Sequence, residues 1–191
     1  MTIYDGRVVG NGEGMSVLAL AILGFLYEEP LHGYELKERI RSLTGHVKPV
    51  SDGALYPAIS RLEQAGLLER RTEPGSAAAP RQVLSLTREG RVELLRRLRE
   101  PTEVEITDRN RYFTLLAFLR HLPSKADQAL VLQRRLAFLD APASFFSTGG
   151  RRVLARDVDD PFRQGMFAIA KATSKAEKDW LMKTIAQLTK R

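Results

Sequence analysis

The chain has no cysteine among its 191 residues. Disulfide bonds, thiol redox sensing and thiolate-ligated zinc sites are therefore excluded. The three histidines lie at no metal-binding helical spacing, and the sequence has no HExxH, GxSxG or glycine-rich phosphate-binding motif. We therefore expect a protein that is not an enzyme and that needs no metal and no cofactor.

The apolar run near the N-terminus is too short to cross a membrane. Residues 15–26, MSVLALAILGFL, span twelve positions, whereas a membrane helix needs about 20. Such a run is typical of a buried core helix. The first 14 residues contain four glycines and no apolar segment of the kind that signal peptides carry. We interpret them as a flexible tail and expect a cytoplasmic protein with no membrane partner.

Acidic residues are fewer than basic ones. The net charge is +7 and the isoelectric point is near 9.9, which suits a nucleic-acid partner. The excess is uneven: residues 1–100 hold 14 Lys and Arg against 13 Asp and Glu, whereas residues 101–191 hold 16 against 10. Because solvated cationic surfaces are common, this balance is compatible with DNA binding but does not identify it.

Residues 51–90 predict a helix, a two-stranded hairpin and the start of another helix. The first helix carries Leu55, Ile59 and Leu62 at a spacing that forms one buried stripe. Gly66 is suited to end it, because glycine tolerates the left-handed conformation found after helices. This order is the ground plan of a winged helix-turn-helix, in which a helix enters the major groove and the hairpin touches the backbone or minor groove.

The predicted hairpin has strands at 67–73 and 82–87, joined by the tip PGSAAAPR. This tip favours no regular structure, because it contains proline and glycine and no large apolar residue. Thr87 is a competent N-cap for the helix that follows. Strand alternation places Arg70 and Arg71 on opposite faces, so at most one of them can point at DNA.

Another helix is predicted upstream, after Pro30, in the segment LHGYELKERIRSL. Its apolar positions are Leu31, Leu36, Ile40 and Leu43. We assign His32 a hydrogen-bonding role at the start of this helix. Three helices therefore precede the hairpin, the usual number for a winged helix.

Three segments, PLHGYELKERI, GALYPAISRLEQAGLL and LSLTREG, occur in this order within residues 15–98. They resemble the PadR family of bacterial transcriptional regulators, and the length of the remainder resembles the subfamily with a sizeable C-terminal helical domain. The resemblance implies a homodimeric, ligand-responsive repressor. One residue departs from the family pattern, because Leu84 stands where an aromatic side chain usually precedes the Leu-Thr pair.

The C-terminal half is predicted to be helical. Residues 107–122 and 124–141 each carry an apolar stripe, and we interpret the mixed residues 142–160 as a loop or a broken helix. A heptad seam then follows, formed by Phe162, Met166, Ile169, Thr173, Ala176 and Trp180. A capping signal at Ser174 and Glu177 leaves one continuous helix and two successive helices equally open. The seam is either core within the chain or, as the resemblance favours, a dimer interface.

We therefore predict a mostly α fold with a β wing. A flexible tail at 1–14 precedes a winged helix-turn-helix domain at 15–100 and a helical dimerisation and effector domain at 101–191. The predicted partners are double-stranded DNA, a second copy of the chain and a small aromatic effector. The predicted function is sequence-specific regulation of transcription from a pseudo-palindromic operator. The alternative is a winged-helix module that binds a protein and no specific DNA sequence.

Three sets of residues are expected to carry this function. The residues expected at the DNA are Lys48, Ser51, Ala54, Tyr56, Pro57, Ser60, Arg61, Arg70 and Arg81. The residues expected at the dimer interface are Phe162, Met166, Ile169 and Trp180. The residues expected at an effector pocket, near the junction of the two domains, are Tyr112, Phe113 and Phe118.

Some of these assignments have structural alternatives. Tyr56 is either a DNA-facing residue or partly core, since it lies beside the buried stripe. Pro57 either lies in the first turn of its helix or kinks that helix. Trp180 is either an interface anchor or ordinary core. Arg81 at the wing tip is expected to contact phosphates rather than bases.

Overall fold

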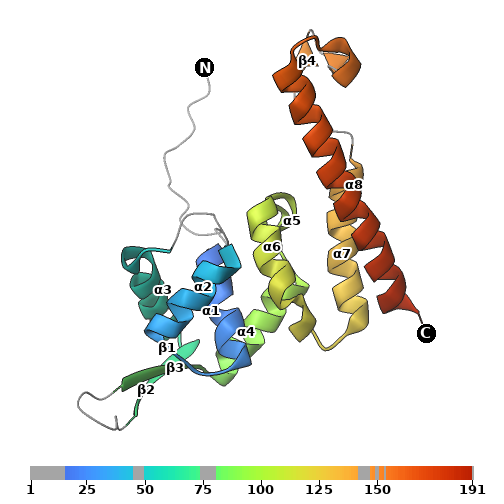
Figure 1. The fold of residues 1–191 in the computed structure, drawn as a ribbon. Helices are drawn as coiled ribbons and strands as arrows, with labels where there is room; N and C mark the ends of the chain where they lie inside the picture. The colour runs from blue at the N-terminus through green and yellow to red at the C-terminus, as the bar shows by residue number, and fades with distance from the viewer. Residues whose placement is uncertain are drawn as a thin grey trace, which may run out of the picture. The chain divides into compact units, whose positions relative to one another are not determined.

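The protein is described by a computed structural model that places residues 16–44, 50–73, 81–141, 147–148, 151–152 and 154–190. The chain forms two compact units (Figure 1). Unit 1 comprises Met1–Leu98 and Phe113–Phe118, and unit 2 comprises Arg99–Tyr112 and Leu119–Arg191. The fold is mostly helical with a small sheet, as predicted. The predicted flexible tail at 1–14 lies outside the described residues.

Helix α1 (Val17–Glu28) packs against α2, α3 and β3 in unit 1. Ser16 caps its start, where Ser16 Oγ accepts a hydrogen bond from the Ala19 N–H at 3.3 Å. Because its sequence is apolar on every side, neighbouring elements cover it and seven of its residues are buried. The predicted core helix is confirmed. In the described parts of the chain, no helix combines the length and the apolar character that a membrane span requires.

A short strand, β1 (Leu31–His32), precedes helix α2 (Gly33–Thr44). The prediction that Leu31 belongs to the second helix is wrong, because its backbone pairs with Leu84 of β3. A buried leucine satisfies a helical and an extended pattern equally well, so periodicity alone could not separate the two. Leu36 and Ile40 form the buried side of α2, as expected.

Helix α3 (Asp52–Gln64), strand β2 (Leu68–Glu73) and strand β3 (Arg81–Leu86) follow in the order of a winged helix. The two strands pair antiparallel, and the sheet order is β1-β3-β2. Gly66 turns the chain from α3 into β2 with a φ of 72°. This is the left-handed conformation that glycine adopts without strain, so the predicted end of the helix is confirmed.

Helix α4 (Arg88–Arg99) begins at the base of the wing. The Thr87 hydroxyl accepts a hydrogen bond from the Gly90 N–H at 3.0 Å and donates one to the Gly66 carbonyl oxygen at 2.7 Å. The predicted N-cap is therefore confirmed. A Cβ at Gly90 would lie 2.1 Å from the Leu67 carbonyl oxygen, so only glycine fits here. Together these contacts fix the end of α3 to the start of α4.

The last residues of α6 (Arg109–Phe118) complete the core of unit 1. The buried Phe118 ring meets Phe25 edge to face, with ring centroids 5.0 Å apart. A Cβ at Gly24 would lie 2.5 Å from the Phe118 ring. The ring therefore fills a notch in α1 that exists because residue 24 has no side chain.

Unit 2 is built mainly from helices (Figure 1). Besides the start of α6, its elements are α5 (Glu103–Thr107), the 3-10 helix η1 (Leu119–His121), α7 (Lys125–Asp140), β4 (Ser147–Thr148), β5 (Arg151–Arg152), the 3-10 helix η2 (Ala155–Asp157) and α8 (Pro161–Thr189). Strands β4 and β5 pair antiparallel. The interpretation of residues 142–160 as a loop or broken helix misses this short ladder, whose two-residue strands are too short to show alternation. Residues 142–146, 149–150 and 153 lie outside the described residues.

Helix α8 is continuous over 29 residues, so the one-helix alternative is correct. Glu177 does not cap a second helix, because its carboxylate accepts a hydrogen bond from Arg135 Nε at 2.7 Å. Arg135 Nη1 also donates to the carbonyl oxygens of Ile106 and Thr107, at 2.7 and 3.1 Å. The Arg135 side chain is buried, and it ties α7 to α8 and to the end of α5.

Candidate nucleic-acid interface

Helix α3 presents an outward face opposite its buried stripe. Leu55, Ile59 and Leu62 on the inner side are at most 3% exposed. On the outer side Tyr56 is 48% exposed, and Arg61 is exposed as well. Tyr56 is therefore outside the core, which removes that alternative. Small residues flank this face, since Ser51, Ala54 and Pro57 are exposed and Ser60 is half-buried.

Pro57 lies inside α3, beyond the first turn that begins at Asp52. The alternative that placed it in the first turn is wrong, because the helix starts directly after Ser51. Proline has no N–H to donate to the carbonyl four residues earlier, and its ring crowds that carbonyl. The crowded residue is Gly53, the least restricted residue type. Helix α3 therefore gives up one internal hydrogen bond near its start, on the outward side.

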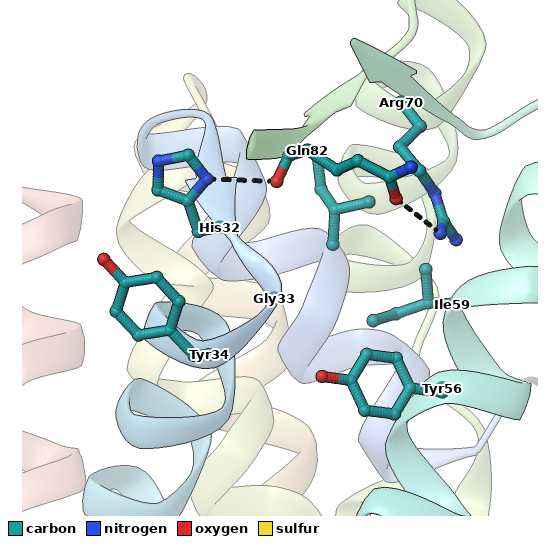
Figure 2. Close-up of a pocket in the computed structure, with 8 residues that line it drawn as sticks. His32, Gly33, Tyr34, Tyr56, Ile59, Arg70 and Gln82 are labelled. Carbon is teal, nitrogen blue, oxygen red and sulfur yellow. Dashed lines mark hydrogen bonds between the residues drawn. The ribbon is translucent and has the colours of Figure 1, made fainter. Parts of the chain in front are cut away.

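A groove of about 430 Å³ lies beside α3 within unit 1 (Figure 2). Its walls come from the start of α2, from α3 and from both wing strands. It is lined by His32, Gly33, Tyr34, Tyr56, Ile59, Arg70, Gln82 and Leu84. Of the residues expected at the DNA, Tyr56 and Arg70 meet in this groove. The departure from the family pattern, Leu84, is buried at its base.

Residues 32–35, the HGYE residues, connect the groove to the wing, and the first three of them form one wall of the groove. His32 Nδ1 lies 3.0 Å from the Gln82 carbonyl oxygen, and the His32 backbone N–H donates to Glu35 Oε2 at 2.9 Å. The second hydrogen bond lowers the pKa of Glu35 and lets its carboxylate cap α2. The Tyr34 ring stacks on His32 with 5.7 Å between centroids. The predicted hydrogen-bonding role of His32 is confirmed, whereas its partner on the wing was not foreseen.

The Arg70 guanidinium in the groove is held by α3 and by the neighbouring strand. Arg70 Nε and Nη2 donate to the two Glu63 carboxylate oxygens at 2.8 and 2.5 Å. Arg70 Nη1 donates to Gln82 Oε1 at 3.0 Å. The hydrogen bonds to Glu63 raise the pKa of Arg70, so the side chain stays charged. Both partners are partly open to solvent, with 36% of the Arg70 side chain and 24% of the Glu63 side chain exposed.

Glu63 shares a face of α3 with two residues expected at the DNA. Tyr56, Ser60 and Glu63 follow one another at positions i, i+4 and i+7, which lie along one side of a helix. Glu63 was not singled out from the sequence, although the helical period that selected Tyr56 and Ser60 also contains it. The side of α3 that carries Tyr56 and Ser60 therefore also carries a carboxylate that Arg70 neutralises.

The remaining cations expected at or near the DNA are placed unequally. Arg71 lies on the other face of β2 from Arg70, as alternation predicted, and pairs with Glu69 at 2.6 Å. Arg81 begins β3, opposite Glu73, and its side chain is outside the described part of the structure. Lys48 lies wholly outside the described residues. The described interface therefore rests on α3, the groove and the base of the wing.

Helix α8 in unit 2 exposes a row of large apolar side chains. Phe162 and Ile169 are 85% and 70% exposed, and Met166 and Trp180 are 44% and 43% exposed. The alternatives in which the seam or Trp180 forms core within the chain are therefore wrong, because these side chains are exposed. Met166 and Ile169 also line a second groove of about 360 Å³, between α7 and α8. Within the described residues of unit 2, this exposed apolar row is the surface that suggests a binding partner.

The residues expected at the effector pocket divide between the two units. Tyr112 is buried in unit 2 with Arg135 4.6 Å above its ring, and Phe118 is buried in unit 1. Phe113 is 45% exposed. The two grooves described above are lined by other residues, and the effector pocket stays a prediction. Among the described residues, no cluster of three or more His, Asp and Glu side chains could hold a metal ion.

Comparisons with known proteins identify the domain that contains this interface. Residues 22–96 match the model of the transcriptional regulator PadR-like family. The transcriptional regulator YqjI of Escherichia coli K12 is 35% identical over 118 residues, which cover 61% of this chain and 52% of that protein. A protein of Shigella flexneri matches to the same extent. The chain spans about half the length of the curated relatives it matches.

Solved structures also resemble this chain. Bacillus subtilis PadR in complex with operator DNA is 21% identical, with a TM-score of 0.44, and the match covers 91% of this chain and 99% of that one. A transcriptional regulator from Clostridium thermocellum is 26% identical, with a TM-score of 0.38, over 41% of this chain and 76% of that one. Residues 22–96 of this chain therefore form a domain of the transcriptional regulator PadR-like family.

Proposed function

We propose that the protein regulates transcription by binding duplex DNA through α3 and the wing. The observation that carries this proposal is the outward face of α3. It exposes Tyr56 and Arg61 beside small residues, on a helix whose opposite side is fixed in the core. Small side chains allow the helix backbone to approach the major groove, while a guanidinium and hydroxyl groups can donate hydrogen bonds to base edges and phosphates.

The winged-helix arrangement gives each part of this surface a different task. In such domains the helix in the major groove reads bases, while the hairpin contacts the backbone or minor groove. Arg61 on α3 is the candidate for base recognition. Arg81 at the start of β3 is the candidate for a phosphate contact. Because His32 connects α2 to the wing through Gln82, the base of the wing and α2 contact DNA as one rigid body.

A homodimer is the second part of the proposal. One helix reads only a few base pairs, whereas two helices about 34 Å apart read two halves of a pseudo-palindrome. The apolar row on α8 provides the surface for a second copy, since isolated monomers rarely expose so much contiguous apolar side chain. In this arrangement the C-terminal helices set the spacing of the two recognition helices, and binding at a promoter represses transcription.

A small aromatic effector completes the proposed regulation. A ligand that favours one dimer geometry over another by several kcal/mol would release most of the DNA. Tyr112, Phe113 and Phe118 remain the residues predicted to contact this ligand. Binding of such a ligand would change both the affinity for DNA and the spacing between the two protomers.

A gel-shift titration against the DNA upstream of the protein's own gene tests this function. The fragment is compared with a random-sequence duplex of the same length at two salt concentrations. We expect tighter binding to the upstream fragment, and affinity for both duplexes should fall steeply with salt because protein cations displace condensed counterions. The matched variant is Arg61→Ala, which removes the proposed base contact. Equal, salt-insensitive or undetectable binding to both duplexes would contradict the proposal.

A further inference from the structure

The Glu63–Arg70 pair places opposite charges on the surface proposed to meet DNA. Glu63 follows Tyr56 and Ser60 along one side of α3, where Ser60 and Glu63 are half-buried, and Arg70 lines the groove beside this side from β2. A carboxylate is unexpected on such a surface, because every DNA phosphate carries a negative charge that repels it. The pair is partly exposed and is not required to fill the core, which leaves electrostatics as its main effect.

The geometry of the pair determines what Arg70 can offer to DNA. Two of its nitrogens donate to Glu63. The third donates to Gln82 (Figure 2), so each nitrogen already has a partner. Two-point contacts between a guanidinium and a carboxylate are stronger than single ones and fix the direction of both groups. While the pair stays closed, its net charge is zero, and it displaces no counterion from the duplex.

We propose that Glu63 is an affinity-limiting residue that withholds the Arg70 charge from DNA and so keeps binding to non-specific sequences weak. Non-specific binding is essentially electrostatic, so it depends directly on how many phosphates the protein neutralises. Holding one cation in a closed pair removes one such contact. The inference rests on the proposed DNA-binding function and adds a residue that opposes binding.

The Glu63→Gln variant tests the proposal. Glutamine keeps an acceptor for Arg70 and nearly the same shape but releases the arginine charge. One additional neutralised phosphate steepens the dependence of log affinity on log salt by about 0.9. The variant should therefore bind a random-sequence duplex roughly 15-fold tighter than wild type at about 50 mM salt, and roughly fourfold tighter at about 200 mM.

Glu69→Gln is the matched control. It removes the same charge as Glu63→Gln, from β2 instead of α3, but its partner Arg71 lies on the face of β2 opposite Arg70. We expect Glu69→Gln to leave both the affinity and the salt dependence close to wild type. Thermal unfolding of both variants, followed by circular dichroism, establishes that the fold is retained.

Three results would overturn the inference. Equal gains for Glu63→Gln and Glu69→Gln would show that only the net charge of the protein matters. A loss of affinity in Glu63→Gln would show that Glu63 positions Arg70 for DNA instead of withholding it. Unchanged affinity and salt dependence in a folded Glu63→Gln variant would show that the pair has no part in binding. Failure of wild type and every variant to bind any duplex would instead contradict the proposed function itself.

Discussion

Arg135 on α7 and Glu177 on α8 form a buried ion pair, with Arg135 Nε 2.7 Å from Glu177 Oε1. Only 3% of the Arg135 side chain and 14% of the Glu177 side chain are exposed. The same guanidinium donates to the last carbonyls of α5. One side chain therefore joins three helices, and among the described residues Glu177 is the carboxylate that compensates its charge.

Removing that carboxylate should destabilise unit 2 severely. Glu177→Ala leaves the Arg135 charge buried without a counter-ion, and we expect the free energy of unfolding to fall by about 3–5 kcal/mol. Urea unfolding followed by circular dichroism measures this loss, at one fixed protein concentration because association also affects stability. Asp179→Asn is the control, since its pair with Lys175 is exposed and should contribute less than about 0.5 kcal/mol. Similar small effects for both variants would contradict the buried-pair account.

Gly24→Ala should destabilise unit 1 by about 1–3 kcal/mol, the usual cost of overpacking. The new Cβ would lie 2.5 Å from the Phe118 ring, which is itself buried. Gly165→Ala on α8 is the control, because nothing lies within 4 Å of a Cβ there, and it should be stabilising by about 0.4–1 kcal/mol. Combining Gly24→Ala with Phe118→Leu should cost less than the two separate losses added together. Strict additivity would show that residue 24 and the ring do not clash.

The buried Tyr112 hydroxyl has no hydrogen-bond partner among the described residues, and burial raises the pKa of Tyr112. Tyr112→Phe should therefore be neutral or stabilising near pH 7, by up to about 1 kcal/mol, because it removes an unsatisfied polar group. In wild type the unfolded chain loses this proton near pH 10, whereas the folded chain keeps it. Stability should then decline above about pH 10 by up to roughly 1.4 kcal/mol per pH unit. The difference between wild type and Tyr112→Phe in urea unfolding at rising pH isolates this decline, and parallel curves would rule it out.

Arg61→Ala should weaken binding to the preferred DNA site by about 1–3 kcal/mol if Arg61 contacts a base. The same substitution should have a much smaller effect on a random-sequence duplex, since base contacts are absent there. Fluorescence anisotropy on both duplexes measures the two affinities. An equal loss on both would reassign Arg61 to the phosphate backbone, and no loss on either would remove it from the interface.

Ile169→Glu should shift the protein from dimer towards monomer. A charge at the centre of the exposed α8 row would lose its hydration at an interface, whereas in the monomer it would stay in water because residue 169 is 70% exposed. Trp180→Ala should act in the same direction through lost apolar contact. Sedimentation velocity measures the state of association, with Leu130→Glu as an exposed control on α7. A wild-type protein that is monomeric at micromolar concentration would contradict both the dimer and the two-half-site mechanism.

Local sequence signals predicted unit 1 well, because its elements begin and end with residues of strong preference. Gly66 and Thr87 marked a helix end and a helix start that the structure confirms. Strand β1 was missed, since two residues are too few to show a period and its pairing depends on a strand about fifty residues away. The continuity of α8 was left open, because the capping signal at Ser174 and Glu177 competes with a tertiary ion pair that no local pattern reveals.

In the candidate interface, too, local patterns predicted some features, whereas features that depend on tertiary contacts were not predicted. Helical periodicity separated the outward Tyr56 and Arg61 from the buried stripe. It did not show that Tyr56 and Arg70 share a groove with the HGYE residues, because that groove forms only when β1 pairs with β3. Periodicity does not single out Glu63, because a glutamate beside cationic residues resembles an ordinary solvent-exposed charge. Its partner Arg70 also belongs to the next element of the chain.

The position of β1 also affects how copies of the protein can meet. With β1 on one side of β3 and β2 on the other, the longer open edge of the described sheet belongs to β2. That strand has the sequence LERRTE, so four of its six residues are charged. Charged side chains on an open edge discourage the strand-to-strand stacking that leads to aggregation. The charged edge of β2 therefore disfavours strand pairing between the wings of two molecules. For two copies of the protein, association through the apolar row of α8 is then the more favourable arrangement.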